Sequence, residues 1–235
     1  MLKQEFLIEG IPSVLWGETS DKLYIAVHGN MSNKADEVIA IIAKEAVERG
    51  YQVLSFDLPE HGDRKNEPYA CSVQNCVHDL GIIMEYAKGI SADISLFACS
   101  MGAYFSLLTY GDESLGQCLF LSPVLDMERL IRNMMAWDGV TEEKLESEKD
   151  IQIPNGPALS WDYFSYVKAH PIVRWDKKTS ILYGSKDNLT ESDVVTAFCS
   201  EFGFKLTVLE NGEHFFYSEE QLSFYRKWLA ENLDH

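Results

Sequence analysis

A chain of 235 residues with 46% hydrophobic and 12% aromatic side chains is long enough to bury the core of one domain and to carry an insertion. Its 37 acidic and 20 basic residues give a formal charge of −17, which argues against nucleic acid and anionic membrane surfaces as partners, because both bind clustered cations.

The cysteines are five in number and lack the spacing of a disulfide framework. Cys71 and Cys76 are close enough in sequence to bridge, but no second Cys or His pair completes a zinc site. Reduced thiols in a cytoplasmic protein are the simplest interpretation, and we expect no metal.

Targeting and membrane signals are weak. The first residues show no positive region followed by an apolar one, so no signal peptide is expected. Residues 94–111 are uncharged and nearly long enough to span a bilayer, but they contain Ser95, Ser100, Gly102 and Ser106. A strand that turns into a buried helix explains this run better than a membrane span.

Short apolar runs alternate with amphipathic segments along most of the chain. We expect strands at residues 5–17, 22–28, 51–57, 94–98, 117–122, 180–184 and 205–209. We expect helices at residues 33–49, 72–88, 103–110, 191–202 and 218–233. This order is typical of an α/β protein with a mainly parallel sheet, helices on both faces and a site at the carboxyl ends of the strands.

Residues 124–178 have a different composition, with no convincing buried strand. They contain an acidic helix candidate at 141–150, a Pro-Asn-Gly-Pro break at 154–157 and a group of aromatic residues. Trp137, Trp161 and Phe164 either line an apolar pocket for an acyl or aromatic group or pack this segment onto the sheet.

The turn after the strand at 94–98 reads Ala-Cys-Ser-Met-Gly, with Ser100 between the small residues Ala98 and Gly102. A strand that passes into a helix through one residue strains that residue, and small neighbours avoid a collision with the crossing backbone. This pattern is a variant of the nucleophile elbow, in which a serine hydroxyl stands clear of the sheet. Cys99 would need small residues at positions 97 and 101 to take that role, but these positions hold Phe97 and Met101.

A serine nucleophile needs a base, and the base needs an acid that fixes its tautomer. Asp187 follows the strand at 180–184, and His214 follows the strand at 205–209. Asp126 is an alternative acid, although it also stands where it would cap a helix.

Together these pieces resemble an α/β-hydrolase-fold serine hydrolase over nearly the whole chain. The matching segments are 28–30, 57–62, 98–102, 184–187 and 212–214. The resemblance implies a small helical cap inserted after the sixth strand, so that residues 1–123 and 179–235 form the core and residues 124–178 the cap.

The resemblance also implies roles. Ser100 would be the nucleophile, His214 the general base and then acid, and Asp187 the orienting carboxylate, while the backbone amides of Asn30 and Met101 would form the oxyanion hole. No cofactor would be needed. Ala98 stands where the family more often has glycine. Independently of the resemblance, we interpret Asp57 as a carboxylate that braces its own loop.

The function that follows is a serine hydrolase that cleaves carboxylic esters or thioesters of small to medium acyl or aromatic acids through an acyl-enzyme on Ser100. Its partner would be a small-molecule ester. The alternatives are a C–C bond hydrolase, a peptidase or lipase of the same fold, and a non-catalytic binding protein. The sequence leaves the substrate and the oligomeric state open.

Overall fold

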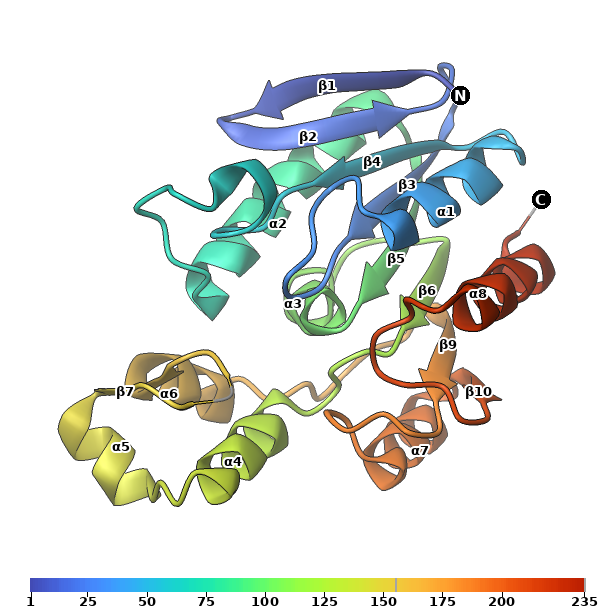
Figure 1. Ribbon diagram of the computed structural model, residues 1–235. Helices are drawn as coiled ribbons and strands as arrows, with labels where there is room; N and C mark the ends of the chain where they lie inside the picture. The colour runs from blue at the N-terminus through green and yellow to red at the C-terminus, as the bar shows by residue number, and fades with distance from the viewer. Residues whose placement is uncertain (155, 235) are drawn as a thin grey trace.

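The computed structural model describes residues 1–154 and 156–234. The predicted break at 154–157 includes Asn155 and so lies partly outside the described residues. The described chain forms an eight-stranded sheet in the order β1-β2-β4-β3-β5-β6-β9-β10 (Figure 1). Its strands are β1 (Lys3–Ile8), β2 (Ile11–Trp16), β3 (Lys22–Val27), β4 (Gln52–Phe56), β5 (Asp93–Cys99), β6 (Gln117–Leu121), β9 (Lys178–Gly184) and β10 (Lys205–Leu209).

The predicted strand at 5–17 is two strands joined by a tight turn. Glu9 and Gly10 both have positive φ, 47° and 91°, as a two-residue hairpin turn requires. β1 therefore pairs antiparallel with β2, and β2 pairs antiparallel with β4. All other pairs of the large sheet are parallel, which confirms the mainly parallel sheet.

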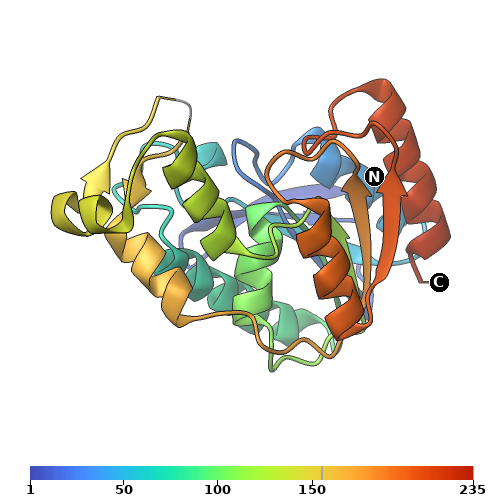
Figure 2. The same ribbon diagram turned by 90° about the horizontal axis from the view of Figure 1, so that it is seen from below.

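Helices cover both faces of the sheet, as predicted. They are α1 (Glu37–Val47), α2 (Val73–Ile90), α3 (Met101–Thr109), α7 (Ser192–Phe202) and α8 (Glu219–Asn232), with a short 3₁₀ turn η1 (Gly62–Arg64). Alternate residues of β3 enter two separate apolar clusters, one with α2, α3 and α7 and the other with α1 and α8. Seen from below, α7 and α8 flank β9 and β10 from opposite sides (Figure 2).

The chain between β6 and β9 forms a mostly helical segment at the lower left of Figure 1. It consists of α4 (Met127–Trp137), α5 (Glu142–Glu148), the short strands β7 (Asp150–Ile151) and β8 (Leu159–Ser160), and α6 (Trp161–Ala169). This agrees with a helical insertion after the sixth strand. Leu145, Leu159 and Phe164 are buried in the same apolar cluster as the sheet residues, so the segment packs onto the core.

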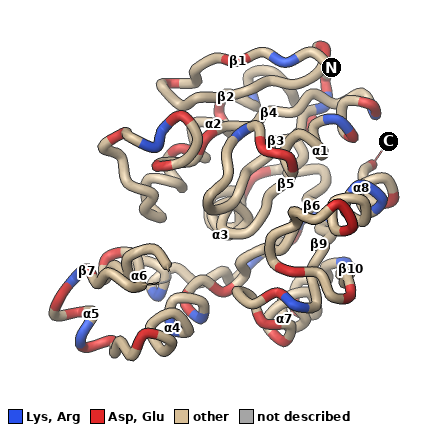
Figure 3. The backbone as a smooth tube through the Cα atoms, viewed as in Figure 1, with Lys and Arg blue, Asp and Glu red and all other residues tan. Residues whose placement is uncertain are grey.

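Acidic and basic residues alternate along the backbone of both the core and the α4–α6 segment (Figure 3). Within residues 1–154 and 156–234, no helix combines the length and the apolar character that crossing a bilayer requires.

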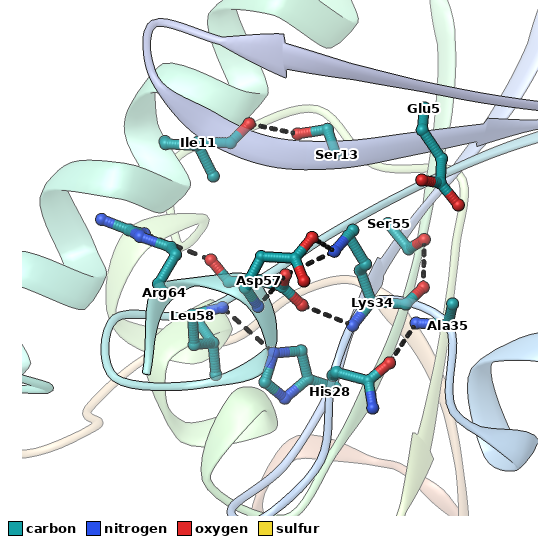
Figure 4. Close-up of polar contacts among 12 residues, drawn as sticks. Glu5, Ile11, Ser13, His28, Lys34, Ala35, Ser55, Asp57, Leu58 and Arg64 are labelled. Carbon is teal, nitrogen blue, oxygen red and sulfur yellow. Dashed lines mark hydrogen bonds and ion pairs between the residues drawn. The ribbon is translucent and has the colours of Figure 1, made fainter. Parts of the chain in front are cut away.

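A buried ion pair fixes the loops that follow β3 and β4. The Asp57 carboxylate accepts hydrogen bonds from the Lys34 backbone N–H at 2.8 Å, from Lys34 Nζ at 2.6 Å and from the Asp63 N–H at 3.0 Å (Figure 4). The Asp57 side chain is fully buried and that of Lys34 is 9% exposed. Burial alone would lower the pKa of Lys34, but the carboxylates of Asp57 and Asp63 raise it, so the ammonium stays charged.

His28 joins the same two loops. The Leu58 N–H donates to His28 Nε2 at 3.0 Å, so the ring proton is on Nδ1, which donates to the Gly29 carbonyl at 2.7 Å. Burial holds the pKa of His28 at about 4, well below its ordinary value, and the ring is neutral. His28 is therefore a structural brace, and its backbone leads through Gly29 to Asn30.

Replacing Asp57 with alanine should lower the free energy of unfolding by about 3 kcal/mol, because it leaves the Lys34 ammonium buried beside only one exposed carboxylate. Asp63→Ala removes the other partner of the same ammonium, but that carboxylate is 71% exposed and should contribute less than about 1 kcal/mol. Urea denaturation of both variants measures the difference, and equal losses would contradict the bracing role of Asp57.

Candidate active site

Ser100 lies in a strained turn between β5 and α3. Its φ is 51° and its ψ is −127°, outside the regions that ordinary residues adopt. The residues around it are small because other backbone lies close. A Cβ at position 102 would collide with the His28 carbonyl oxygen, and a Cβ at position 29 would stand 2.9 Å from Ser100 Cβ.

The structure brings Ser100, His214 and Asp187 into a single hydrogen-bonded relay. Ser100 Oγ lies 2.9 Å from His214 Nε2, and His214 Nδ1 lies 2.7 Å from Asp187 Oδ2. The His214 side chain is 1% exposed and the Asp187 side chain is fully buried. A carboxylate only accepts, so His214 donates from Nδ1 to Asp187, which leaves Nε2 free to accept the proton of Ser100.

Asp187 is held by its own loop. Its second oxygen, Oδ1, accepts the N–H groups of Leu189 at 2.9 Å and Thr190 at 3.0 Å. These bonds leave Oδ2 to face the imidazole. The carboxylate therefore has a fixed orientation before any substrate arrives.

The loop after β9, which carries Asp187, and the loop after β10, which carries His214, pack against each other along their backbones. A Cβ on Gly184 would stand 2.5 Å from the carbonyl carbon of Gly212. The Lys186 N–H donates to the Gly212 carbonyl at 2.8 Å, and the Ser185 N–H donates to the Leu209 carbonyl at 2.9 Å. This close approach carries Asp187 to His214 from a neighbouring strand.

A cavity of about 370 Å³ opens beside Ser100 and His214. Its wall combines apolar and aromatic side chains with two carboxylates, Asp36 and Glu37, at the start of α1. Three of the apolar side chains are solvent-exposed, namely Met31 at 78%, Phe215 at 44% and Tyr217 at 67%. The Phe215 ring stands edge-on to the His214 ring, with centroids 5.0 Å apart.

Neither a family model nor a curated protein matches the sequence. Solved structures do match in shape. Est1E from Butyrivibrio proteoclasticus, determined with ferulic acid bound, superposes with a TM-score of 0.78 at 16% identity over 98% of this chain and 99% of that one. Alpha/beta hydrolase domain-containing protein 10 from mouse gives 0.76 at 12% identity, over 98% of each chain. The Pyrococcus furiosus esterase Pf2001 gives 0.70 at 19% identity, over 98% of this chain and 89% of that one.

This chain has the α/β-hydrolase fold. In that fold the strand order and the crossover helices place Ser100, Asp187 and His214 at the carboxyl ends of β5, β9 and β10.

The two residues expected to form the oxyanion hole come from two different elements near Ser100. Met101 is the first residue of α3, and Asn30 lines the cavity from the loop after β3. The side-chain oxygen of Asn30 lies 3.1 Å from His61 Nε2. Their role toward a reacting carbonyl stays a prediction.

The three aromatic residues of the α4–α6 segment lie away from the cavity that contains Ser100. Phe164 is buried in the core, Trp161 is half-buried with Lys149 Nζ 5.7 Å from its ring centre, and Trp137 is 62% exposed at the end of α4. None of them belongs to the cavity wall among the described residues. The positions favour packing for Phe164 and give no contact between these rings and the relay.

The other candidates have structural roles. Asp126 caps α4, accepting the Arg129 N–H at 2.9 Å, and makes no contact with His214 among the contacts of the described residues. Burial raises the pKa of the Cys99 thiol far above its ordinary value. In residues 1–154 and 156–234, no group of three His, Cys, Asp or Glu side chains could hold a metal ion.

The sequence analysis predicted Asn30, Ser100 and His214 at the cavity but missed the exposed apolar side chains of its wall. Met31 directly follows Asn30, Phe215 directly follows His214, and Tyr217 lies two positions further along. The aromatic residues at 215–217, next to the predicted base, could have indicated an apolar wall beside the site. Ser122 was also missed. The register pairs Cys99 with Leu121, which sets Ser122 beside Ser100 at the sheet edge, and both line the cavity.

Asp187→Asn should slow the labelling of Ser100 by a fluorophosphonate by about three to four orders of magnitude, because an amide in place of the carboxylate favours the wrong imidazole tautomer. Asp126→Asn is the matched control and should change the rate by about tenfold or less, since asparagine also caps helices well. Time-resolved intact mass spectrometry measures both rates. The reverse ranking, with both variants folded, would identify Asp126 as the acid.

Proposed function

We propose that this protein is a serine hydrolase that cleaves carboxylic esters or thioesters of small to medium acyl or aromatic acids through an acyl-enzyme on Ser100. The observation that carries the proposal is the Ser100–His214–Asp187 relay, with contacts of 2.9 and 2.7 Å, at the wall of a cavity. A strained serine, a buried imidazole and a fully buried carboxylate in this order are the parts that acyl transfer needs.

In the proposed mechanism Ser100 Oγ attacks the carbonyl carbon of the ester while His214 Nε2 takes its proton. Asp187 stabilises the imidazolium that forms. The tetrahedral intermediate collapses as His214 returns the proton to the leaving alcohol or thiol. A water molecule then attacks the acyl-enzyme through the same relay and frees Ser100.

Two backbone amides are proposed to stabilise the negative oxygen of the intermediate. The Met101 N–H is at the start of α3, where helix N–H groups have no partner within the helix. The second donor would be Asn30, which the braces around His28 and Asp57 hold in place. Such donors are typically worth about 3 kcal/mol each to the transition state.

The alternatives are less well supported. Two of the structural neighbours carry the name esterase or a bound aromatic acid, which favours ester cleavage over C–C bond, peptide or lipid hydrolysis. A non-catalytic binding protein would have no need of the relay or of the strain at Ser100. Reaction with a fluorophosphonate separates a hydrolase from such a scaffold.

The acyl or aromatic group of the substrate is proposed to bind against Met31, Phe215 and Tyr217. These apolar side chains are exposed at the cavity that contains Ser100, which is where a substrate would cover them. The carboxylates of Asp36 and Glu37 in the same wall disfavour anionic substrates. An uncharged ester with an apolar or aromatic group fits both features.

Ser100→Ala should abolish hydrolysis of p-nitrophenyl esters and labelling by a fluorophosphonate, because the hydroxyl forms the acyl bond. The loss in turnover should be about a millionfold. Ser200→Ala, an exposed serine on α7, is the control and should label like the wild type. Retention of more than a few per cent of activity by the purified Ser100 variant would refute the assignment.

Phe215→Ala should lower the preference for longer or aromatic acyl groups by about tenfold, the size of one lost apolar contact in a substrate pocket. The measurement is the ratio of kcat/KM for p-nitrophenyl octanoate and acetate, since a general disturbance of His214 cancels in the ratio. Trp161→Ala should leave the ratio unchanged. A change in Trp161→Ala alone would place the acyl group on the α4–α6 segment instead.

A further inference from the structure

Two cysteines meet at the start of α2. Ser72 is the N-cap of this helix and accepts the Asn75 N–H at 3.2 Å. Cys71 therefore precedes the cap, and Cys76 is the fourth residue of the helix. Side chains at these two positions pack against each other in many helices. Here the pair is two thiols, and their sulfur atoms lie 3.6 Å apart.

The two thiols have different surroundings. Cys76 is fully buried, whereas Cys71 is only partly buried, so Cys71 is the sulfur that a small reagent reaches first. The hydrogen bond with Cys76 lowers the pKa of Cys71, and His61 lowers it further, against the opposing effects of burial and of the Glu60 carboxylate. Burial raises the pKa of Cys76 and keeps that thiol protonated.

His61 supplies positive charge beside Cys71. Its Nδ1 lies 2.8 Å from the Pro59 carbonyl, and its Nε2 lies 3.1 Å from the side-chain oxygen of Asn30. Both partners are acceptors, which favours the ring that carries a proton on each nitrogen. Burial would lower the pKa of His61, but Cys71 and the Pro59 carbonyl raise it.

The remaining cysteines lack such a setting. Burial raises the pKa values of Cys99, Cys118 and Cys199. The Lys177 ammonium opposes this effect at Cys118 but does not overcome it. Reactivity toward oxidants follows thiolate character and access, so it should concentrate at Cys71.

We propose that Cys71 and Cys76 form a peroxide-sensitive dithiol, with Cys71 the attacking sulfur and Cys76 the resolving one. The Cys71 thiolate attacks hydrogen peroxide, breaks the O–O bond and becomes a sulfenic acid as hydroxide leaves. Cys76 Sγ then attacks the Cys71 sulfur, and its proton leaves with the hydroxyl group as water. Two thiols and one peroxide thus give one disulfide and two waters.

The test uses the full-length protein in its native state. After brief treatment with hydrogen peroxide, free thiols are blocked with N-ethylmaleimide and the protein is digested with trypsin. Cys71 and Cys76 fall in one tryptic peptide, residues 66–88. That peptide should be lighter than its reduced form by two hydrogen atoms and carry no maleimide, and dithiothreitol should restore two maleimide sites. The peptides with Cys99, Cys118 and Cys199 should stay fully labelled.

The Cys76→Ser variant separates the two steps. It should accumulate a sulfenic acid at Cys71 that dimedone traps, whereas Cys199→Ser, the matched control, should still close the disulfide. Iodoacetamide should alkylate Cys71 at least about tenfold faster than Cys199 at neutral pH. The proposal fails if the wild-type peptide keeps both maleimide sites, or if Cys99, Cys118 or Cys199 is oxidised first, and the wild-type measurement decides this even if the variant does not fold.

Discussion

The close contact between the loop after β3 and the turn at Ser100 is the constraint on which the site depends. There is no room for a side chain at position 102 against the His28 carbonyl, or at position 29 against Ser100. The loop must therefore keep one path. Hydrogen bonds that join His28 and Lys34 to the loop after β4 fix the conformation of the loop after β3. A set of buried polar contacts outside the cavity wall thus fixes the loop that carries Asn30 to the cavity beside Ser100.

A second contact of the same kind aligns the acid and the base. Gly184 and Gly212 allow the loops after β9 and β10 to touch along their backbones, and this brings Asp187 beneath His214. Parallel pairing of β9 and β10 sets both loops at the same edge of the sheet. The relay therefore depends on the close contacts at Gly29 and Gly102 and at Gly184 and Gly212, and on the register of the strands from β3 to β10. The side chains of Ser100, Asp187 and His214 supply the chemistry.

Much of this was predictable from sequence because it rests on local signals. The amino-acid sequence alone shows the small residues around Ser100 and the apolar strands. It also shows Ser100, Asp187 and His214 in the order typical of this fold. The hairpin at Glu9 and Gly10 was not separated, because the apolar pattern continues through a two-residue turn. The sequence did not predict that Met31, Phe215 and Tyr217 line the cavity. Their position depends on how the loops after β3 and β10 pack around Ser100, which no local pattern encodes. The aromatic residues of the α4–α6 segment suggested a substrate pocket as one of two roles, but Phe164 is buried in the core.

Three residues with left-handed backbone meet at the cavity, namely Met31, Ser100 and Ser122, with φ of 58°, 51° and 43°. A residue in such a conformation costs about 1–3 kcal/mol, which the rest of the fold must offset. Ser122 adds a buried hydroxyl without a hydrogen-bond partner among the described residues. The cavity thus holds backbone strain and an unpartnered hydroxyl at the sheet edge, and substitutions selected only for heat resistance would tend to relax them. Thermostable variants that keep the geometry at Ser100 should therefore carry their changes on the far edge of the sheet or on exposed helix faces.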